Sequence, residues 1–431
     1  MKERIEIFIE DCREEMLSDI AQLIKFQSIE GNDDQIYGAL EFVLDRAREM
    51  GFEVNETTTG DVGVIDLGTG KETLGILTHV DVVGIGDIEK WEHNPFDAKI
   101  GGGFIAGRGS VDDKGPVIMS LYAMKAVREL RGIPGRKVRL IVGTREESEW
   151  TDMENYRKEF DLPDYGFSPD GEFPIFNIEK GYCDVKLTFK GREYKDIIKL
   201  EAGDSPNTIP SKAEITFADG EELVFNGVSV HSSDPQQGIN AIELLSEGYR
   251  IRHMGFARFV RDFFSDDGMG EGLEIDDGTD SCNGVKVGKT VASPTILKKS
   301  GDKIILNINL RHKFGVRRED VEEAFAREGG AYGFELEIVD FGSPMMTDCR
   351  QEPFVIMQET MKAYGYEPEI KIASGASYAS SMPNMVSWGP VFEKESAEHG
   401  AHVENERLSI ETMMTATKMY AYYLEKMLWK E

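Results

Sequence analysis

Cysteine is scarce in this sequence and basic residues are outnumbered, and both shortages exclude classes of function. The four cysteines, Cys12, Cys183, Cys282 and Cys349, lie far apart with no CxxC spacing. This pattern is typical neither of a disulfide framework nor of a zinc site built from thiolates. Lysine and arginine total 49 against 79 aspartates and glutamates, which gives a formal net charge of −30. So acidic a chain disfavours nucleic acid or an anionic membrane as a partner.

The sequence also lacks a long apolar run. No stretch approaches the roughly 20 apolar residues that cross a bilayer, and the opening segment MKERIEIFIEDCREEM carries too many charges for a signal peptide. We therefore expect a soluble cytoplasmic protein. At 431 residues the chain is longer than one compact core usually needs, which predicts two domains.

Strands alternate with helices over the first 180 residues. Helices are expected at 5–24, 34–50 and 116–130, and strands at 52–56, 62–67, 74–83 and 137–144. This alternation predicts an α/β domain with a largely parallel sheet between helices. After Gly181, short alternating strands indicate an α+β insertion with antiparallel pairing, and the helical period returns from Glu352. Ranges 1–180 and 353–431 would then form one domain, and 181–352 a second.

A histidine and several carboxylates stand where such a sheet presents its chemistry, at strand ends and helix starts. His79 and Asp81 follow an apolar run and share one face of an extended segment, and Asp112 lies farther on, shortly before Pro116, which suits the first turn of a helix. Neutral imidazole and carboxylate oxygens suit zinc, manganese or cobalt, so the linked motifs predict a metal site. A satisfied histidine beside a solvated acidic loop remains the alternative for His79 taken alone.

Three more carboxylates of interest lie farther along the chain. Glu146 and Glu147 are adjacent at the end of an expected strand, where neighbouring side chains point in different directions. One of them can bind metal while the other faces the substrate. Asp170 is held in a tight turn between Pro169 and Gly171. Taken one by one, these residues fit solvated glutamates and an ordinary turn aspartate equally well.

The insertion contains two polar features of interest. His231 lies in a polar loop before a helix that is expected to bury Leu244, among others. The strand 303–311 alternates apolar residues with polar ones, and the polar set includes Asn309 and Arg311. That polar face fits either the lining of a cleft or an ordinary solvated sheet surface.

Taken together, these segments resemble the di-zinc metallopeptidases of the aminoacylase, carboxypeptidase G and dipeptidase V family. The resemblance rests on HVDVV, GRGSVDDKGP, TREESEWTDM, FSPDGEFP, NTIPSKA, VHSSDPQQGINAIELL, SYASSMPN and HVENE, in this order. The sequence is most similar to the dipeptidase V branch, the carnosinase-like Xaa-His dipeptidases. The resemblance implies a zinc-peptidase-like fold, in which a mixed, mostly parallel sheet is flanked by helices. Residues 181–352 would be an α+β lid that binds substrate, inserted into the catalytic metal-binding domain.

The resemblance also implies a metal-ligand set. Two divalent ions, zinc with manganese or cobalt as alternatives, would share Asp112. His79 and Asp170 would complete the site of one ion, and Glu147 and His402 the site of the other.

Other roles follow from the same resemblance. Asp81 would hold His79 in place, and Glu146 would be the general base. The substrate-binding residues would be His231, Arg311, Asn207 and Ser377. Ser380 stands where many relatives have arginine, so substrate recognition near this loop is expected to differ.

The activity implied is hydrolysis of the peptide bond in dipeptides and other short peptides. Two alternatives stay open: an N-acyl-amino-acid deacylase or desuccinylase of the same family, and a non-catalytic relative that binds metal or peptide. Such a relative would have no need of Glu146, which is present here. A monomer and a homodimer both fit the sequence.

Overall fold

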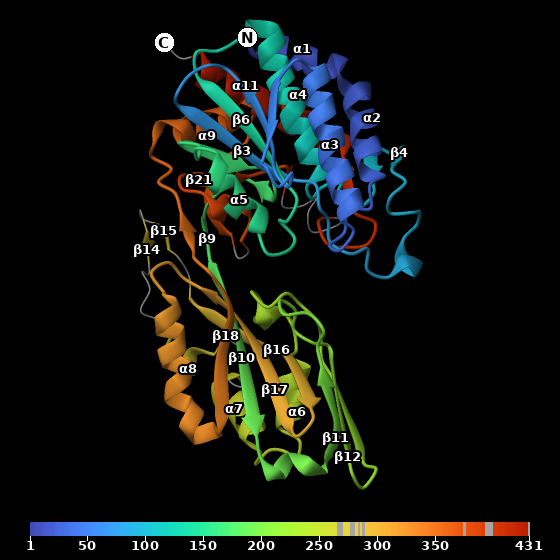
Figure 1. The fold of residues 1–431 in the computed structure, drawn as a ribbon, viewed down its shortest axis with the longest axis vertical. Coiled ribbons are helices and arrows are strands. Elements are labelled where there is room, and N and C mark those ends of the chain that lie inside the picture. Colours follow the sequence, from blue (N-terminus) through green and yellow to red (C-terminus); the bar gives the residue numbers. More distant parts are fainter. Residues whose placement is uncertain are drawn as a thin grey trace. The chain divides into compact units, whose positions relative to one another are not determined.

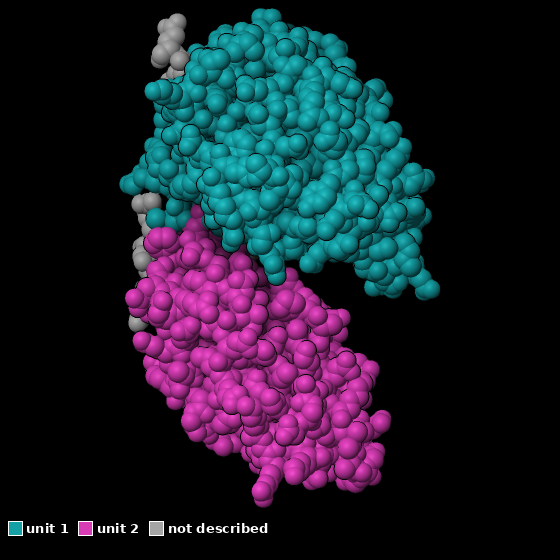
Figure 2. Space-filling model, in the orientation of Figure 1, with its two compact units in different colours: residues 1–177, 346–371, 377–431 teal, residues 178–345, 372–376 magenta. Residues whose placement is uncertain are grey.

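The computed structural model of the chain describes residues 1–264, 270–275, 281–282, 285–286, 289–373, 376–392 and 400–429. The chain forms two compact units, which Figure 2 colours separately. Unit 1 comprises Met1–Asn177, Met346–Lys371 and Ser377–Glu431, and unit 2 comprises Ile178–Met345 and Ile372–Ala376. Each unit has its own cluster of buried apolar side chains. None of the helices within the described ranges has the length and apolar character that crossing a membrane requires.

Unit 1 is built around a nine-stranded mixed sheet (Figure 1). In spatial order the strands are β1 (Glu53–Glu56), β2 (Gly63–Leu67), β6 (Lys137–Gly143), β3 (Thr73–His79), β7 (Tyr165–Ser168), β21 (Met385–Trp388), β9 (Ile175–Glu179) and β19 (Met345–Met346), and β20 (Ile370–Ala373) pairs with β9. The central pairs β6–β3, β3–β7 and β7–β21 are parallel. The pairs β1–β2, β2–β6 and β21–β9 are antiparallel.

Helices pack on this sheet and on one another. They are α1 (Lys2–Asp11), α2 (Arg13–Ile24), α3 (Asp33–Glu49), α4 (Lys114–Arg131), α5 (Thr151–Glu159), α9 (Glu352–Ala363) and α11 (Ile410–Leu428). Helix α3 contacts β1 and β2, and α4 contacts β3, β6, α2 and α11. The predicted α/β class, a mixed sheet flanked by helices, is confirmed.

The single helix expected over 5–24 is two consecutive helices, α1 and α2, which meet at Cys12. Cys12 caps the end of one helix and the start of the next, and the backbone N–H of Met16 donates to its carbonyl at 2.9 Å. The apolar stripe continues across this junction, since Ile5, Ile9 and Met16 are all fully buried. The periodicity therefore predicted the buried face correctly and missed the interruption.

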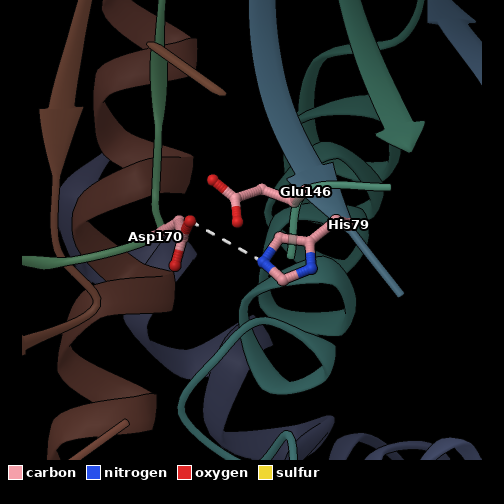
Figure 3. Close-up of side chains that lie close together, drawn as sticks. All are labelled: His79, Glu146 and Asp170. Atoms are coloured by element: carbon pink, nitrogen blue, oxygen red, sulfur yellow. Dashed lines mark ion pairs between the residues drawn. The ribbon is translucent and has the colours of Figure 1, made fainter. Parts of the chain in front are cut away.

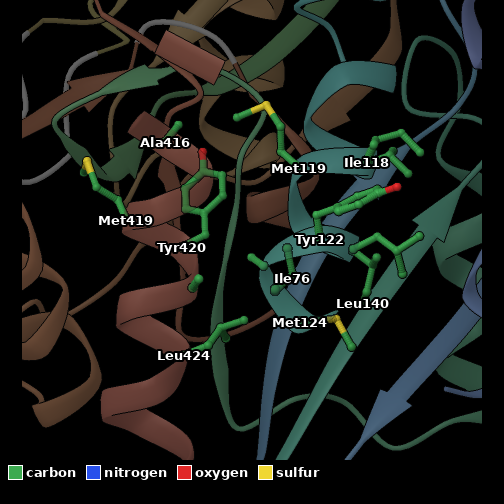
Figure 4. Packing of buried hydrophobic residues seen from close by; sticks show 14 of the residues in the cluster. Ile76, Ile118, Met119, Tyr122, Met124, Leu140, Ala416, Met419, Tyr420 and Leu424 are labelled. Atoms are coloured by element: carbon green, nitrogen blue, oxygen red, sulfur yellow. The ribbon is translucent and has the colours of Figure 1, made fainter. Parts of the chain in front are cut away.

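The core of unit 1 lies where β3 and β6 face α4 and α11, as Figure 4 shows. Fully burying one large apolar side chain contributes about 1.5–3 kcal/mol, so this layer holds the strands that carry the candidate site. The labelled members are Ile76, Ile118, Met119, Tyr122, Met124, Leu140, Ala416, Met419, Tyr420 and Leu424.

Unit 2 contains a seven-stranded antiparallel sheet. In spatial order its strands are β13 (Glu222–Asn226), β12 (Lys212–Phe217), β11 (Ile197–Ala202), β16 (Val291–Ser300), β17 (Lys303–His312), β10 (Gly181–Lys190) and β18 (Phe334–Gly342). The helices are α6 (Ala241–Ser246), α7 (Gly255–Phe264) and α8 (Arg318–Tyr332). The predicted α+β texture with antiparallel pairing is confirmed. Leu244, expected in the buried face of α6, is instead exposed.

Several short elements complete the described structure. One small sheet joins β23 (Arg407–Ser409), β5 (Phe104–Ala106) and β4 (Lys99–Gly101), another joins β22 (Val391–Phe392) and β8 (Glu172–Phe173), and a third joins β14 (Ser281–Cys282) and β15 (Val285–Lys286). Single 3-10 turns are η1 (Ile88–Lys90), η2 (Arg192–Asp196), η3 (Pro235–Gln237), η4 (Glu271–Leu273) and η5 (Tyr378–Ser381).

Candidate metal centre and substrate residues

The parallel strands of unit 1 bring the predicted ligands to one edge of the sheet. His79 is the last residue of β3 and pairs with Gly143, the last residue of β6. Glu146 and Glu147 follow β6, and Asp170 follows β7, which pairs with β3 on its other side. Because neighbouring parallel strands end at the same edge, these loops meet there.

Asp112 reaches this edge from the loop before α4. The carboxylate of the next residue, Asp113, accepts the backbone N–H of His79 at 3.0 Å, which ties this loop to the end of β3. His402 comes from the loop before β23, far along the chain, and has a positive φ of 65°. The site is therefore assembled from five separate segments of unit 1.

His79 is fully buried, and its two ring nitrogens face different partners. Nδ1 lies 3.0 Å from the Asp81 carbonyl oxygen and 3.3 Å from Asp81 Oδ1. Both are acceptors, so Nδ1 carries a proton. Nε2 lies 3.0 Å from Asp112 Oδ1 and 3.6 Å from Asp170 Oδ2. Nε2 and Asp112 Oδ1 are both buried and have no hydrogen-bond partner among the described residues.

Asp112 joins this group to a second histidine. Its other oxygen, Oδ2, lies 3.0 Å from His402 Nε2, and the same nitrogen lies 3.1 Å from Glu147 Oε1. Asp112 therefore presents one oxygen to each histidine, as a bridging ligand does. The side chain of His402 is 53 % exposed, so solvent reaches this part of the cluster.

Two sets of three residues each bring ligand atoms within 4.8 Å of one another. One set is His79, Glu146 and Asp170, and in Figure 3 the Glu146 carboxylate lies beside the His79 ring and Asp170. The other set is Asp112, Glu147 and His402. The distances alone leave Glu146 in reach of a bound cation or of a water beside it.

Asp81 connects the imidazole to the two glutamates. Its Oδ1 faces His79 Nδ1 and accepts the backbone N–H of Glu146 at 3.3 Å, and its Oδ2 accepts the backbone N–H of Glu147 at 2.9 Å. A carboxylate that orients a metal-binding imidazole from behind is a common supporting arrangement. Asp81 thus fixes His79 and the following loop at once.

Burial and crowding shift the pKa values in the cluster. Burial, with Asp170 nearby, raises the pKa of Glu146 well above its ordinary value, and burial with Asp112 raises the pKa of Glu147 to about 7. Burial disfavours the charged form of His402, but its contacts with Asp112 and Glu147 outweigh this and raise its pKa to about 12. The cluster thus holds protons strongly and favours positive charge at its centre.

The donor set fits divalent cations. Two buried atoms that face each other without a hydrogen bond, His79 Nε2 and Asp112 Oδ1, are atoms that a bound cation would satisfy. Imidazole nitrogens combined with carboxylate oxygens suit zinc, manganese or cobalt. The residues that would hold the ions are His79, Asp112, Glu147, Asp170 and His402.

Sequence reasoning missed Glu406, which ties two ligand segments together. Its fully buried carboxylate accepts Arg108 Nη1 at 2.7 Å and three backbone N–H groups of residues 109–112. Glu406 follows His402 in the same loop, and Asp112 is one of the backbone donors. The only sequence signal for Glu406 was its place in the HVENE segment, and that segment does not show that the Glu406 side chain accepts backbone N–H groups.

Sequence reasoning also missed the side chains that hold the backbone at and before Glu146. Trp150 Nε1 donates to the Glu146 carbonyl at 2.7 Å. The buried Asp152 accepts the O–H of Tyr378 at 2.5 Å and the backbone N–H groups of residues 144 and 145. The Tyr378 ring lies edge-on to both His79 and Trp150, with centroids 5.9 and 5.8 Å away. Trp150 and Asp152 belong to the TREESEWTDM segment, but bonds to backbone leave no spacing pattern.

Ser377 lies in unit 1, directly before Tyr378. It is buried, and its hydroxyl caps η5 by accepting the backbone N–H of Ala379 at 3.2 Å. The hydroxyl of Ser380 donates to the Ser377 carbonyl at 2.8 Å. Ser380 therefore stabilises a local turn. A contact of Ser377 with substrate stays a prediction.

Unit 2 brings His231 and Asn207 together. Both are exposed, and the Asn207 carbonyl accepts the backbone N–H of Ser232 at 2.9 Å. Asn309 of β17 accepts the Ser232 hydroxyl at 2.7 Å, which places the His231 loop beside this strand.

Arg311 is also on β17, two residues after Asn309, and both side chains are buried. These two side chains therefore do not lie on a solvated face of the sheet. The Arg311 guanidinium lies 5.9 Å from the ring centroid of Tyr182, and its Nε has no hydrogen-bond partner among the described residues. Burial lowers the pKa of Arg311, with Asp184 acting in the opposite direction.

Comparison with protein families gives one match over most of the chain. The model described as "Peptidase family M20/M25/M40" matches residues 75–426. A curated relative from Bacillus subtilis (strain 168), named "Putative dipeptidase YtjP", is 28% identical over 458 residues. That alignment covers 95% of this chain and 96% of the relative.

Two solved structures share the fold over nearly their whole lengths. Human carnosine dipeptidase 1 superposes with a TM-score of 0.67 at 14% identity and covers 98% of each chain. The di-peptidase Dug1p from Saccharomyces cerevisiae superposes with a TM-score of 0.68 at 15% identity, covering 99% of this chain and 98% of the other. At such identities the likeness shows the fold.

Proposed function

Because the chain belongs to peptidase family M20/M25/M40, we propose that it is a metal-dependent dipeptidase that hydrolyses the peptide bond of short peptides. The names of the curated relative and of the two solved structures support the choice of dipeptides. The observation that carries the proposal is that the two carboxylate oxygens of Asp112 each lie 3.0 Å from Nε2 of a different histidine.

We assign two divalent ions to the cluster, zinc with manganese or cobalt as alternatives. His79 and Asp170 would hold one ion, Glu147 and His402 would hold the other, and Asp112 would contribute to both. When bound, such a pair of ions lowers the pKa of a water and polarises the scissile carbonyl. Asp81 keeps the His79 ring in the orientation that this assignment needs.

Glu146 is proposed as the general base that takes a proton from the attacking water and returns it to the departing amine. Without metal, burial and Asp170 raise its pKa, and cations bound beside it would lower it again and leave a carboxylate able to accept a proton. Its backbone is held at two points: its N–H donates to Asp81, and its carbonyl accepts the indole N–H of Trp150. Glu147 differs because its carboxylate already contacts His402.

Unit 2 is proposed as the substrate-binding lid. Arg311 is suited to hold the terminal carboxylate of a peptide, because a guanidinium can make two parallel charge-assisted hydrogen bonds to it. His231 would donate a hydrogen bond to the oxygen that becomes negative in the transition state. Asn207 and Ser377 would add polar contacts to the substrate.

The proposal is tested by assaying the purified chain, loaded in turn with zinc, manganese and cobalt, against dipeptides, tetrapeptides and N-acyl amino acids. We expect dipeptides to be cleaved fastest, and Glu146→Gln to lose most of the activity. Preference for N-acyl amino acids would make the chain a deacylase of the same family. Metal binding without hydrolysis of any of these substrates would show a non-catalytic relative.

Oligomeric state is tested by mixing two inactive variants, Glu146→Gln and His231→Ala. Activity recovered on mixing would mean that His231 acts on a substrate held by a second copy of the chain. No recovery, together with a monomeric mass in solution, would mean that one chain supplies all groups.

A further inference from the structure

Ser233 makes two contacts with the same nitrogen of His231. The Ser233 backbone N–H donates to His231 Nδ1 at 3.2 Å, and the Ser233 hydroxyl oxygen lies 2.7 Å from the same atom. A backbone N–H can only donate, so Nδ1 must offer a lone pair. The hydroxyl, which can donate or accept, then also donates to Nδ1.

A neutral imidazole carries one proton, and an accepting Nδ1 leaves that proton on Nε2. The contacts of Ser233 therefore select one of the two neutral tautomers of His231. The backbone N–H opposes a proton on Nδ1, because two donors would then face each other, whereas the hydroxyl can turn to suit either tautomer.

The segment that carries these contacts is itself anchored. Ser232, between His231 and Ser233, uses all three of its polar groups. Its N–H donates to the Asn207 carbonyl, its carbonyl accepts the Ser293 hydroxyl at 3.0 Å, and its own hydroxyl donates to Asn309. Asn309 in turn donates to Asp184 Oδ1 at 2.7 Å. Because Ser232 is held at all three groups, the side chains of its neighbours, His231 and Ser233, keep their places relative to each other.

We infer that Ser233 is a positioning residue that holds neutral His231 in the tautomer with its proton on Nε2. His231 then acts on substrate as a hydrogen-bond donor and not as a proton acceptor. This inference rests on the proposed function for its catalytic meaning, but the tautomer itself is a property of the chain alone.

The first test reads the tautomer directly. Protein labelled with ¹⁵N-histidine is studied by long-range ¹H–¹⁵N correlation near neutral pH, and His231→Ala identifies the signals of His231 among the seven histidines. We expect the protonated nitrogen to be Nε2, recognised by its couplings to both ring carbon-bound protons. A proton on Nδ1, or on both nitrogens, would overturn the inference whatever the enzyme hydrolyses.

The second test uses Ser233→Ala, with Ser233→Thr to restore the hydroxyl and Ser300→Ala, at an exposed strand end, as the matched control. Loss of the hydroxyl that donates to Nδ1 should increase the share of the tautomer with its proton on Nδ1 and lower kcat about twofold to tenfold, with little change in KM. The threonine variant should recover both the tautomer share and kcat. A Ser233→Ala variant that matches the Ser300→Ala control in tautomer share and in kcat would overturn the role of Ser233.

The third test separates a donor from a base. The amide nitrogen of Gln can occupy the place of Nε2, whereas that of Asn reaches only as far as Nδ1. We therefore expect His231→Gln to turn over dipeptide about tenfold faster than His231→Asn. Equal loss in both variants would contradict the donor role. If the wild-type chain hydrolyses no peptide at all, the proposed function fails, while the spectrum still decides the tautomer.

Discussion

The polar clusters of the two units favour ligands of opposite charge. At the sheet edge of unit 1, five carboxylates crowd around two histidines, and burial raises the pKa values of Glu146 and Glu147. On the sheet of unit 2, the buried Arg311 has an Nε without a hydrogen-bond partner in the described structure, and burial lowers its pKa. The first cluster favours added cations, and the second favours an added anion. Metal ions and a peptide carboxylate are the two proposed ligands with those charges.

The two clusters also arise from different strand geometry. Parallel strands β3, β6 and β7 place side chains from three loops at one edge, so distant residues meet there. The antiparallel strand β17 places Asn309 and Arg311 on one face because side chains alternate every second residue. A change at the edge of unit 1 should therefore alter metal binding or proton transfer, and a change at Arg311 on the face of unit 2 should alter substrate binding.

The largest effect is expected at Glu146. Glu146→Gln should retain its metal and bind substrate but lose about a hundredfold or more in kcat, since a positioned base is typically worth that much. Glu147→Gln should lose metal affinity as well, because its carboxylate contacts His402. Metal analysis and steady-state kinetics of both variants check this. Identical behaviour of the two variants would contradict the division of roles.

The next largest effect is expected at Arg311. Arg311→Ala should raise KM for free dipeptides by about tenfold to a hundredfold, because a charge-assisted hydrogen bond is lost. Dipeptides amidated at the C-terminus should be affected far less, and metal content should stay unchanged. Arg311→Lys should recover little, since lysine has no planar pair of donors. An equal rise in KM for amidated dipeptides would contradict a carboxylate contact.

A smaller effect is expected at Trp150, which holds the backbone of Glu146. Trp150→Phe removes the donor to the Glu146 carbonyl and should lower kcat about twofold to tenfold, with KM and metal content unchanged. Trp91→Phe is the matched control, because the Trp91 indole N–H donates to the Ile85 carbonyl at the same 2.7 Å. Should both variants lose the same fraction of kcat, Trp150 would have no special relation to the base.

The smallest effect is a shift of thermal stability with pH. Without metal, the folded-state pKa of Glu147 is about 7 against an ordinary 4.5, so the folded chain binds this proton more tightly than the unfolded chain. Its contribution to stability is present below the ordinary value and is lost as pH rises through about 7. His402, with a pKa raised to about 12, acts in the same direction above 6.5.

Bound metal replaces these protons, so metal binding strengthens as pH rises. We therefore expect the difference in Tm between metal-loaded and chelated protein to increase by several degrees between about pH 5 and about pH 8. Thermal scans across this range measure it, and Glu147→Gln should flatten the pH dependence of the chelated chain. A difference in Tm that shrinks with rising pH would contradict the sign.

The sequence predicted the edge of unit 1 well, because strand ends and helix starts are visible in a pattern of apolar runs and glycines. Glu147 follows a strand that was expected close to its observed bounds, and His79 lies in another, whereas β7, the strand before Asp170, was not expected and only the turn was. The strand expected over 74–83 ends earlier, at His79, so Asp81 lies beyond it and still contacts the ring. The assignment of His402 as a partner of Asp112 came from the family resemblance, because no local pattern joins segments so far apart.

The supporting residues were not predictable in this way. Glu406 and Asp152 act through bonds to backbone N–H groups, which any folded segment can offer and no spacing encodes. Strand alternation likewise showed that Asn309 and Arg311 share a face, but not that this face is buried. Ser232 of a neighbouring loop hydrogen-bonds Asn309 on this face, and that loop is placed by tertiary contacts.

The central claim is that Asp112 divides its two oxygens between two metal ions, and the number of ions bound per chain tests it most directly. Zinc titration of chelated protein should reach two ions in the wild type and one in His402→Ala, with His79, Asp112 and Asp170 retaining the other. Asp112→Ala should weaken the binding of both. A wild-type chain that binds no ion, or a His402→Ala variant that binds as many ions as the wild type, would contradict the account.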